Sequence, residues 1–263
     1  MHRRQISSIA HTLHPIAAPL SAASVRTLLD RAVPDGEARL LDLGCGSGTW
    51  LLRAQAGRPD LRADGVDNDA DALVAARAAA DAAGLGDRVA FYAQDAAGFS
   101  SPHRYDLVLS IGASHAFGGM LPTLKAAESH LVPGGRVLVG DCFWEHEPDR
   151  GTLDSGFAAD EYDDLATTVD RVVAEGWVPL YGHVSTLQEW DDYEWSWTGS
   201  LSRWALDHPG DPDHVQALNA AAAHRAAWLH GYRGTLGFVT LLLGREPGPP
   251  YAVSRDLPTP SPS

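Results

Sequence analysis

A glycine-rich segment, Asp-Leu-Gly-Cys-Gly-Ser-Gly at residues 42–48, constrains the fold of this 263-residue chain more than any other feature. It follows a short apolar run, 39–43, and precedes a stretch of helical character, 49–55. A glycine-rich loop between a first strand and its helix is where doubly wound α/β folds bind nucleotides. The segment therefore predicts an α/β domain that binds a nucleotide-containing ligand at this loop.

Apolar runs and helical patterns alternate along the rest of the chain. Strands are predicted at 39–43, 62–66, 88–93, 105–111, 136–141, 177–183 and 237–243, and helices at 24–32, 49–55, 69–83, 121–130 and 160–175. Such alternation with short turns is typical of parallel βαβ units. We expect a doubly wound, mostly parallel, seven-stranded sheet, with a helical cap at 188–233 inserted before the last strand.

The loop sequence discriminates between classes of ligand. A dinucleotide fingerprint, G-x-G-x-x-G, needs a third glycine where the chain has Thr49, and no Lys-Ser/Thr pair marks a P-loop. Asp42, at the end of the first strand, can attract the ammonium group of an amino acid and would repel a pyrophosphate. The loop therefore favours a ligand that joins an amino acid to a nucleoside.

Two further acids end neighbouring strands. Asp67 follows the second strand, where a carboxylate can accept hydrogen bonds from both ribose hydroxyls. Asp95 follows the third strand, where it can accept a hydrogen bond from an adenine amino group. We expect these two side chains to bind the nucleoside part of the ligand.

Five motifs in order give the chain a resemblance to the class I S-adenosylmethionine-dependent methyltransferases, strong over about residues 37–143. They are LLDLGCGSG at 40–48, GVD at 65–67, QDA at 94–96, YDLV at 105–108 and LVPGGRVLV at 131–139. The resemblance implies a Rossmann-like methyltransferase fold, with Asp42 and the loop near the methionine moiety, Asp67 on the ribose, Asn68 beside the adenine, and Asp95 and Ala96 at its edge. The predicted cofactor-binding set is Asp42, Gly44, Cys45, Gly46, Gly48, Thr49, Asp67, Asn68, Asp95, Ala96, Ile111 and Gly112. We interpret Cys45 as a small loop residue and not as a nucleophile.

We expect one methyltransferase domain over residues 1–245, with a core at 37–187 and 234–245 and an N-terminal lid at 1–33. The prediction of a lid comes from the resemblance, because the N-terminal segment commonly closes over the cofactor in this family. Residues 246–263 contain six prolines and little apolar content, which predicts a disordered tail.

Composition narrows the classes of partner. Twenty Lys and Arg residues against 34 Asp and Glu give a formal charge of −14, which disfavours binding to a nucleic-acid backbone. No apolar stretch is long enough to span a membrane, and the N-terminus lacks the apolar region of a secretory signal. The two cysteines belong to no disulfide or CxxC pattern, which favours a cytoplasmic location. The expected partner is a small-molecule substrate, and the oligomeric state stays open between monomer and dimer.

The acceptor is expected over the residues that follow the fourth and fifth strands. His115 is the candidate general base, because imidazole titrates near neutral pH. It could equally orient the substrate or bond to a loop backbone. Trp144 could wall the pocket and Glu145 could bind a polar group, although a core aromatic residue and a solvated acid are the alternatives.

The segment 189–197 holds three of the eight tryptophans and four acids. Trp190, Tyr193 and Trp197 share one helical face, which either packs the cap on the sheet or forms an aromatic, acidic pocket. If the segment forms such a pocket, Tyr193 on this face and the neighbouring Trp195 are candidate substrate-binding residues. So is His14, which the resemblance brings toward the acceptor. His11 and His14 lack a third ligand, so no metal is predicted.

The sequence thus predicts an S-adenosylmethionine-dependent methyltransferase that acts on an oxygen, nitrogen or carbon atom of a small molecule. One alternative is a protein that binds the cofactor without transfer and acts as a sensor or partner. A nicotinamide-dependent oxidoreductase is a further alternative, against which Thr49 argues.

Overall fold

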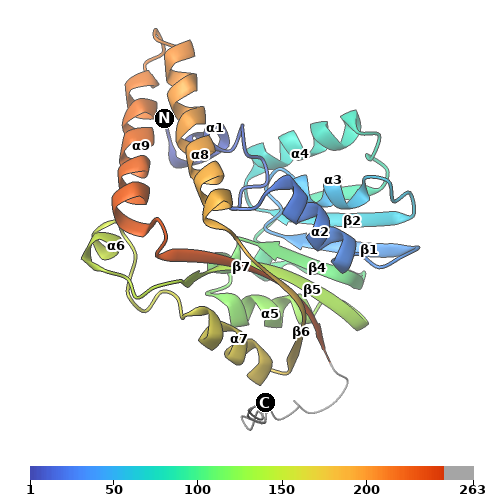
Figure 1. Cartoon of the computed structure of the whole chain (residues 1–263). Coiled ribbons are helices and arrows are strands. Elements are labelled where there is room, and N and C mark those ends of the chain that lie inside the picture. Colours follow the sequence, from blue (N-terminus) through green and yellow to red (C-terminus); the bar gives the residue numbers. More distant parts are fainter. Residues whose placement is uncertain (246–263) are drawn as a thin grey trace, which may run out of the picture.

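The computed structural model describes residues 1–245, in which helices flank both faces of a seven-stranded sheet (Figure 1). The predicted tail, 246–263, lies outside the described residues. The strands are β1 Ala38–Leu43, β2 Leu61–Asp67, β3 Val89–Ala93, β4 Tyr105–Ile111, β5 Leu131–Trp144, β6 Trp177–Val184 and β7 Leu236–Arg245. The helices are α1 Arg3–Ala10, α2 Ala22–Ala32, α3 Thr49–Gln55, α4 Ala70–Ala82, α5 Met120–Glu128, α6 Arg150–Asp154, α7 Leu165–Ala174, α8 Leu187–Asp207 and α9 His214–Ala227. Short helical turns are η1 Ala96–Gly98, η2 Ser114–Ala116 and η3 Trp228–Tyr232, the last of π type.

The sheet has the order β3-β2-β1-β4-β5-β7-β6, and β7 alone runs antiparallel to its neighbours. This arrangement confirms the predicted doubly wound, mostly parallel sheet. The carboxyl ends of β1, β2 and β3 lie next to one another, and so do those of β4 and β5. Loops at that edge therefore bring together residues that are far apart in sequence, as ligand sites in such sheets require.

Two apolar clusters fill the layers between the sheet and the helices. One joins α2 and α3 to the face that carries Leu40, Leu107 and Leu138, and the other joins α5 and α7 to the face that carries Leu41, Val108 and Val139. Alternate residues of each central strand thus face opposite layers. This explains why these strands read as continuous apolar runs.

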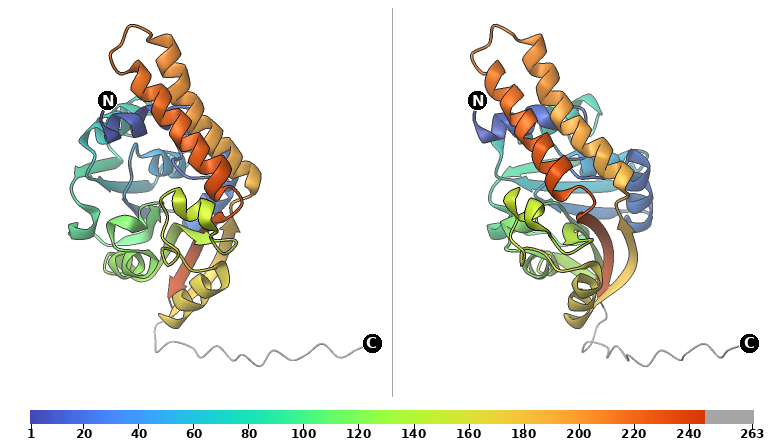
Figure 2. Two further views of the ribbon diagram at one scale, coloured as in Figure 1. Left: turned by 90° about the vertical axis from the view of Figure 1, so that its left-hand side faces the viewer. Right: turned by 60° about the vertical axis from the view of Figure 1, so that its left-hand side comes forward.

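The cap is a pair of antiparallel helices, α8 and α9, that rises beyond the sheet (Figure 2). It occupies the predicted segment before the last strand, which confirms the inserted cap. Ala10 of α1 packs with Leu201 and Ala221, so the first helix lies against the cap. Within residues 1–245, no helix is long and apolar enough to cross a bilayer.

Two predicted elements differ from the structure. The helix expected at 160–175 begins only at Leu165, because the Asp164 side chain accepts a hydrogen bond from Thr167 N and caps the helix there. Strand β5 begins at Leu131 and not at Arg136. Pro133 and the two glycines after it, which lie between the predicted helix 121–130 and the predicted strand 136–141, belong to β5 at an irregularity in its pairing with β4.

Glu189, in the first turn of α8, ties the cap to the N-terminal segment. Its Oε1 accepts hydrogen bonds from Ser21 N at 2.8 Å and from the Ser24 hydroxyl at 2.6 Å. Its Oε2 accepts one from Thr186 N at 3.0 Å, which completes a capping box, and lies 3.1 Å from His183 Nε2. Burial acts to raise the pKa of Glu189, but these hydrogen bonds outweigh it and lower the pKa to about 2.

We expect Glu189→Gln to lower the free energy of unfolding by about 2–3 kcal/mol at neutral pH, because charge-assisted hydrogen bonds are lost. A depressed pKa stabilises the fold fully above about pH 4.5, and that contribution fades as the pH falls toward 2. Urea unfolding of both proteins at neutral pH and at about pH 3 should therefore show a smaller difference in acid. The exposed Glu147→Gln serves as control. An equal loss in both variants would contradict this role.

Candidate functional site

The loop after β1 is shaped by backbone that only glycine adopts readily. Gly44 and Gly46 have φ of +88° and +50°. Gly44 N and Cys45 N both donate to Val66 O, at 2.9 and 3.0 Å, which holds the loop on the end of β2. A Cβ on Gly46 would meet no atom within 4 Å, so the loop backbone is open to a ligand on that side.

Asp42 lies directly beneath this loop, with its side chain almost fully buried. Its Oδ2 has no hydrogen-bond partner in the described structure. Burial, reinforced by the negative charge of Asp67, raises the pKa of Asp42 to about 8. An unpaired buried carboxyl group is costly, and a bound ammonium group would satisfy it. The site therefore fits the amino-acid end of S-adenosylmethionine.

Asp67, at the end of β2, organises the loop. Its Oδ2 accepts a hydrogen bond from Gly46 N and its Oδ1 one from Asp69 N, both at 2.8 Å. Each carboxylate oxygen can accept a second hydrogen bond, and Asp67 is only partly buried. The side chain can therefore hold the loop and still accept hydrogen bonds from a diol.

The remaining predicted cofactor residues lie around the same edge. Asn68 is exposed, Asp95 is exposed and caps η1 through Ala97 N at 3.1 Å, and Ala96 is buried. Thr49 begins α3, and its hydroxyl lies 3.0 Å from that of Ser47. Burial raises the pKa of the Cys45 thiol, which disfavours a reactive thiolate.

The N-terminal segment reaches the end of β4, where the next predicted residues lie. Ile111 is partly buried, and Gly112 follows it with φ +68° and donates from N to Gly140 O at 2.8 Å. A Cβ on Gly112 would lie 3.9 Å from Ala17 O. The segment expected to act as a lid thus lies beside the residues that follow β4.

His14 and Tyr193 meet at this place, as edge-to-face rings with centroids 5.4 Å apart. His14 Nδ1 has no partner in the described structure, and burial lowers the pKa of His14. The Tyr193 hydroxyl lies 3.2 Å from Nε2 of His11, whose pKa burial also lowers. Two candidate substrate residues that are far apart in the sequence are therefore brought together. No metal-binding cluster is present within residues 1–245.

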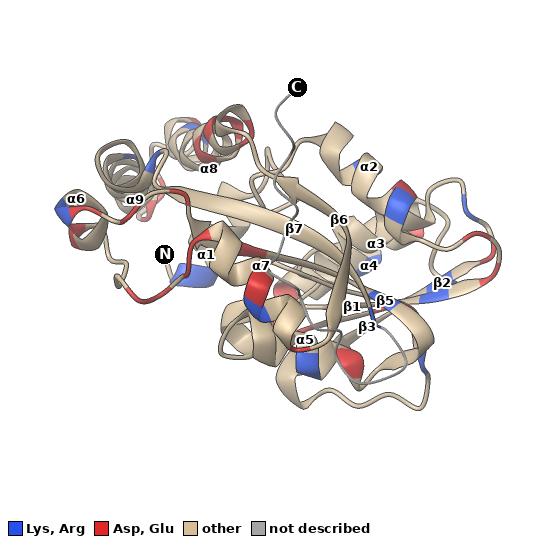
Figure 3. Ribbon diagram, turned by 60° about the horizontal axis from the view of Figure 1, so that its bottom comes forward, with Lys and Arg blue, Asp and Glu red and all other residues tan. Residues whose placement is uncertain are grey.

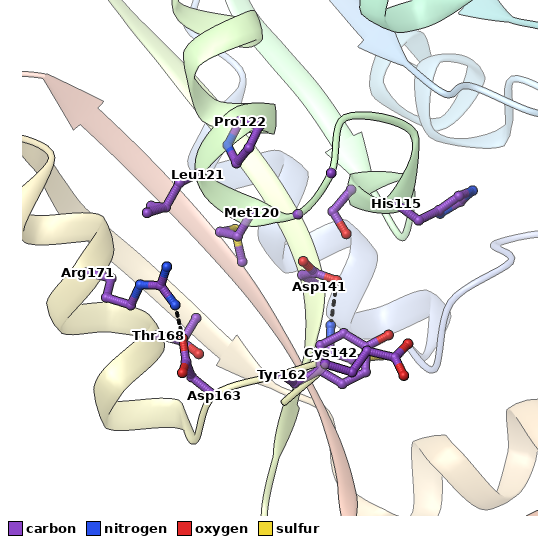
Figure 4. Close-up of a pocket in the computed structure, with 14 residues that line it drawn as sticks. His115, Met120, Leu121, Pro122, Asp141, Cys142, Tyr162, Asp163, Thr168 and Arg171 are labelled. Carbon is purple, nitrogen blue, oxygen red and sulfur yellow. Dashed lines mark hydrogen bonds and ion pairs between the residues drawn. The ribbon is translucent and has the colours of Figure 1, made fainter. Parts of the chain in front are cut away.

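A cavity of about 350 Å³ opens where β4 and β5 end (Figure 4). The residues that line it are Ser114, His115, Gly118, Gly119, Met120, Leu121, Pro122, Asp141, Cys142, Glu161, Tyr162, Asp163, Thr168 and Arg171. His115 is exposed on the turn η2. Asp141 is buried, and its Oδ1 accepts a hydrogen bond from Cys142 N at 2.9 Å. Burial raises the pKa of Asp141, against the opposing effects of Ser114, Cys142 N and His115.

None of the five predicted substrate residues lines this cavity: His14 and Tyr193 lie outside it, and so do the other three. Trp144 is buried, donates from Nε1 to Ala159 O at 3.1 Å and packs edge-on against Phe157 and Tyr162, so it supports the wall from behind. Glu145 is exposed. Trp195 is half exposed and packs edge-on against Trp228, with ring centroids 5.0 Å apart.

The predicted aromatic stripe of α8 mainly packs the cap. Trp190 belongs to the apolar layer above the sheet, and Trp197 stacks on His224 with ring centroids 3.7 Å apart. Between them lies the buried Glu194, whose carboxylate accepts a hydrogen bond from the Tyr232 hydroxyl at 2.8 Å and lies 2.7 Å from His224 Nε2. No spacing in the sequence brings Glu194, His224 and Tyr232 together, because they lie on two helices and a turn that meet only in the fold.

Asp141, Glu161 and Tyr162 were also missed as site residues. Asp141 was recognised only as the end of the fifth strand, a position shared by many structural acids. Glu161 and Tyr162 were assigned to a helix, whereas they lie in the irregular segment before α7. Their position after the strand of Asp141 was the only signal for them in the sequence.

Comparison with known proteins agrees with this geometry. Residues 34–194 match a family described as a methyltransferase domain. An uncharacterized protein, YjhP, from Escherichia coli K12 is 26% identical over 210 residues, which are 79% of this chain and 84% of that protein. The crystal structure of a methyltransferase from Thiobacillus denitrificans in complex with S-adenosyl-L-homocysteine superposes with a TM-score of 0.84 at 25% identity, covering 94% of this chain and 99% of the other. One from Geobacter sulfurreducens, with the same ligand, gives a TM-score of 0.82 at 24% identity, covering 92% and 98%.

Proposed function

This chain belongs to the class I S-adenosylmethionine-dependent methyltransferases, and we propose that its methyl acceptor is a small molecule bound in the cavity at the ends of β4 and β5. The observation that supports this most directly is the position of that cavity. Its lining begins at Ser114, two residues beyond Gly112, and so adjoins the predicted cofactor residues. A volume of about 350 Å³ falls in the range of small-molecule pockets.

Cofactor binding is assigned to residues of the first three strand ends and of β4. Asp42 holds the ammonium group, Asp67 accepts from the ribose hydroxyls, and Asp95 with Asn68 borders the adenine. The open backbone of Gly46 lets the ligand approach the loop. The bound cofactor supplies an electrophilic methyl group on a sulfonium centre.

The chain's own part in transfer is alignment and proton removal. The walls of the cavity must hold the acceptor atom about 3–3.5 Å from the methyl carbon and in line with the bond that breaks. His115, which lines the cavity, is our candidate to accept a proton from an oxygen, nitrogen or carbon nucleophile. His14 and Tyr193, on the N-terminal segment and the cap, help to exclude water from the neighbouring cofactor.

Charge supports a small acceptor over a nucleic acid. The chain carries a net charge of −14, and helices α2, α6 and α7 each carry residues of both signs (Figure 3). A protein that grips a phosphate backbone needs a continuous basic face. Helices that carry both positive and negative residues do not form a continuous basic face.

Two measurements test the proposal. Calorimetry should show S-adenosylhomocysteine binding to the purified protein, with no heat from a nicotinamide dinucleotide. Incubation with methyl-labelled cofactor and a fractionated metabolite extract should then label a low-molecular-weight product, detected by mass spectrometry. Binding without any labelled product would favour a sensor, and labelling of added RNA alone would refute a small acceptor.

His115→Gln is expected to lower kcat about 100-fold with the acceptor so identified, because glutamine cannot take up a proton. Affinity for S-adenosylhomocysteine should stay within about twofold, since His115 lies on the acceptor side. His103→Gln, exposed and outside the cavity, is the matched control. An unchanged kcat would assign His115 to orientation or loop structure.

A further inference from the structure

The charges that line the acceptor cavity are unbalanced. Asp141, Glu161 and Asp163 contribute three carboxyl groups. Arg171 is the only Lys or Arg among the lining residues of the described chain, and its guanidinium is paired with Asp163. Asp141 and Glu161 thus have no Lys or Arg partner at the cavity, and His115 is the other residue of the described lining that can carry a positive charge.

Asp141 is the better placed of these two acids. It extends from β5 toward the cavity, beside Cys142 and Tyr162 (Figure 4). Its side chain is only 8% exposed, and its hydrogen bonds come from uncharged groups, the Cys142 amide and the Ser114 hydroxyl. A buried carboxylate is costly without a charged partner, which a cationic ligand would provide.

The surroundings of Asp141 suit an organic cation better than a hydrated metal ion. Tyr162 brings an aromatic ring to the cavity, and Met120 and Leu121 add apolar surface from the start of α5. Aromatic rings attract cations, and apolar walls bind the carbon skeleton that carries the charge. Glu161 adds a second negative charge from the segment before α7.

We propose that the acceptor is an organic cation, a molecule that carries a protonated or quaternary amine, and that Asp141 binds its charged nitrogen while Glu161 favours its entry. The methyl group goes to a different oxygen, nitrogen or carbon atom of the same molecule, because the charged nitrogen has no lone pair, and His115 takes the proton that this atom releases. This inference rests on the proposed function, since it concerns the same cavity. It disfavours acceptors whose only charge is a carboxylate or phosphate, because the one Lys or Arg residue in the described lining, Arg171, is already paired with Asp163.

The test uses two probes of similar shape and opposite charge, 2-phenylethylamine and 3-phenylpropanoate. Their affinities are measured by calorimetry on the full chain saturated with S-adenosylhomocysteine, so that no turnover occurs. At about pH 7.5 the amine is protonated and the acid is ionised. We expect the amine to bind at least about tenfold more tightly than the carboxylate.

Asp141→Asn should lower the affinity for the amine about tenfold and remove the preference, with binding of S-adenosylhomocysteine unchanged. Glu175→Gln, an exposed residue at the far end of α7, removes the same charge and should leave the preference intact. If Asp141→Asn does not fold, Glu161→Gln serves in its place, because Glu161 is exposed; a loss of about threefold is expected.

Equal affinity for the two probes, including undetectable binding of both, would overturn the inference, as would a preference that survives both Asp141→Asn and Glu161→Gln. Failure of the protein to bind S-adenosylhomocysteine would instead overturn the proposed function. The two failures are therefore distinguishable in one series of titrations.

Discussion

Replacing Asp42 with asparagine is expected to stabilise the ligand-free protein at neutral pH and to weaken binding of S-adenosylhomocysteine at least about tenfold. The carboxyl group is almost fully buried, has an unpartnered oxygen, and has a pKa raised to about 8. In the unfolded chain the same group titrates near 3.8. Between these two values the folded state holds a proton that the unfolded state has released.

Stability contributed by this group is therefore present below about pH 4 and is lost progressively as the pH rises to about 8. Asparagine does not titrate, so the variant avoids that loss. Allowing for the cost of a buried amide, we expect a gain of about 2 kcal/mol at pH 7–8, or a rise in Tm of about 4–8 °C. Near pH 4 the gain should vanish.

Thermal unfolding of both proteins from about pH 4 to 8, with and without S-adenosylhomocysteine, checks this result. The ligand should raise the Tm of the wild type far more than that of the variant, because the variant lacks the charge that binds the ammonium group. A variant that is less stable at pH 8 and binds the ligand normally would show that Asp42 is only structural.

Gly44→Ala is the second change with a large expected effect. The residue has φ +88°, and an added Cβ would lie 2.4 Å from the Cβ of Ala113. Backbone strain and overpacking together are expected to cost about 3 kcal/mol, a fall in Tm of about 6–12 °C. Because Ala113 lies between the glycine loop and the acceptor cavity, binding of S-adenosylhomocysteine should be lost as well.

Gly46→Ala is the matched control in the same loop. It has the same kind of backbone strain, at φ +50°, but its Cβ would meet no atom within 4 Å. We expect about 1 kcal/mol of destabilisation, with a loss of ligand affinity because the methyl group projects into the proposed cofactor space. Ala113→Gly should restore stability to Gly44→Ala and not to Gly46→Ala. Rescue of both variants, or of neither, would contradict the steric explanation.

The fold was predictable because local signals agreed with one another. The run 107–109 is wholly apolar and becomes the buried centre of strand β4, and Ser21 and Asp69 cap the helices that they precede. Errors arose where a short side chain decided the outcome. Asp164 caps α7, so the helix begins only at Leu165. The spacing of apolar residues does not reveal which polar residue caps a helix.

The two halves of the site differ in how far the sequence specifies them. The proposed cofactor contacts come from strand ends at fixed positions in the motifs, so Asp42 and Asp67 could be proposed from their positions in the sequence. The acceptor cavity joins β4, β5 and the irregular segment before α7, and its shape depends on packing between them. Asp141 and Tyr162 therefore emerged only from the structure, whereas Trp195 and Glu145, named for their chemistry, lie outside the cavity lining.

Glu189 links segments that the linear order separates. Through it the start of α2, the start of α8 and strand β6 are held by one carboxylate, and Ala17 lies between α1 and α2 beside the end of β4. The N-terminal segment cannot swing outward without breaking hydrogen bonds to the helical pair. Glu189 thus fixes the N-terminal segment on α8 beside the end of β4, next to the proposed cofactor site.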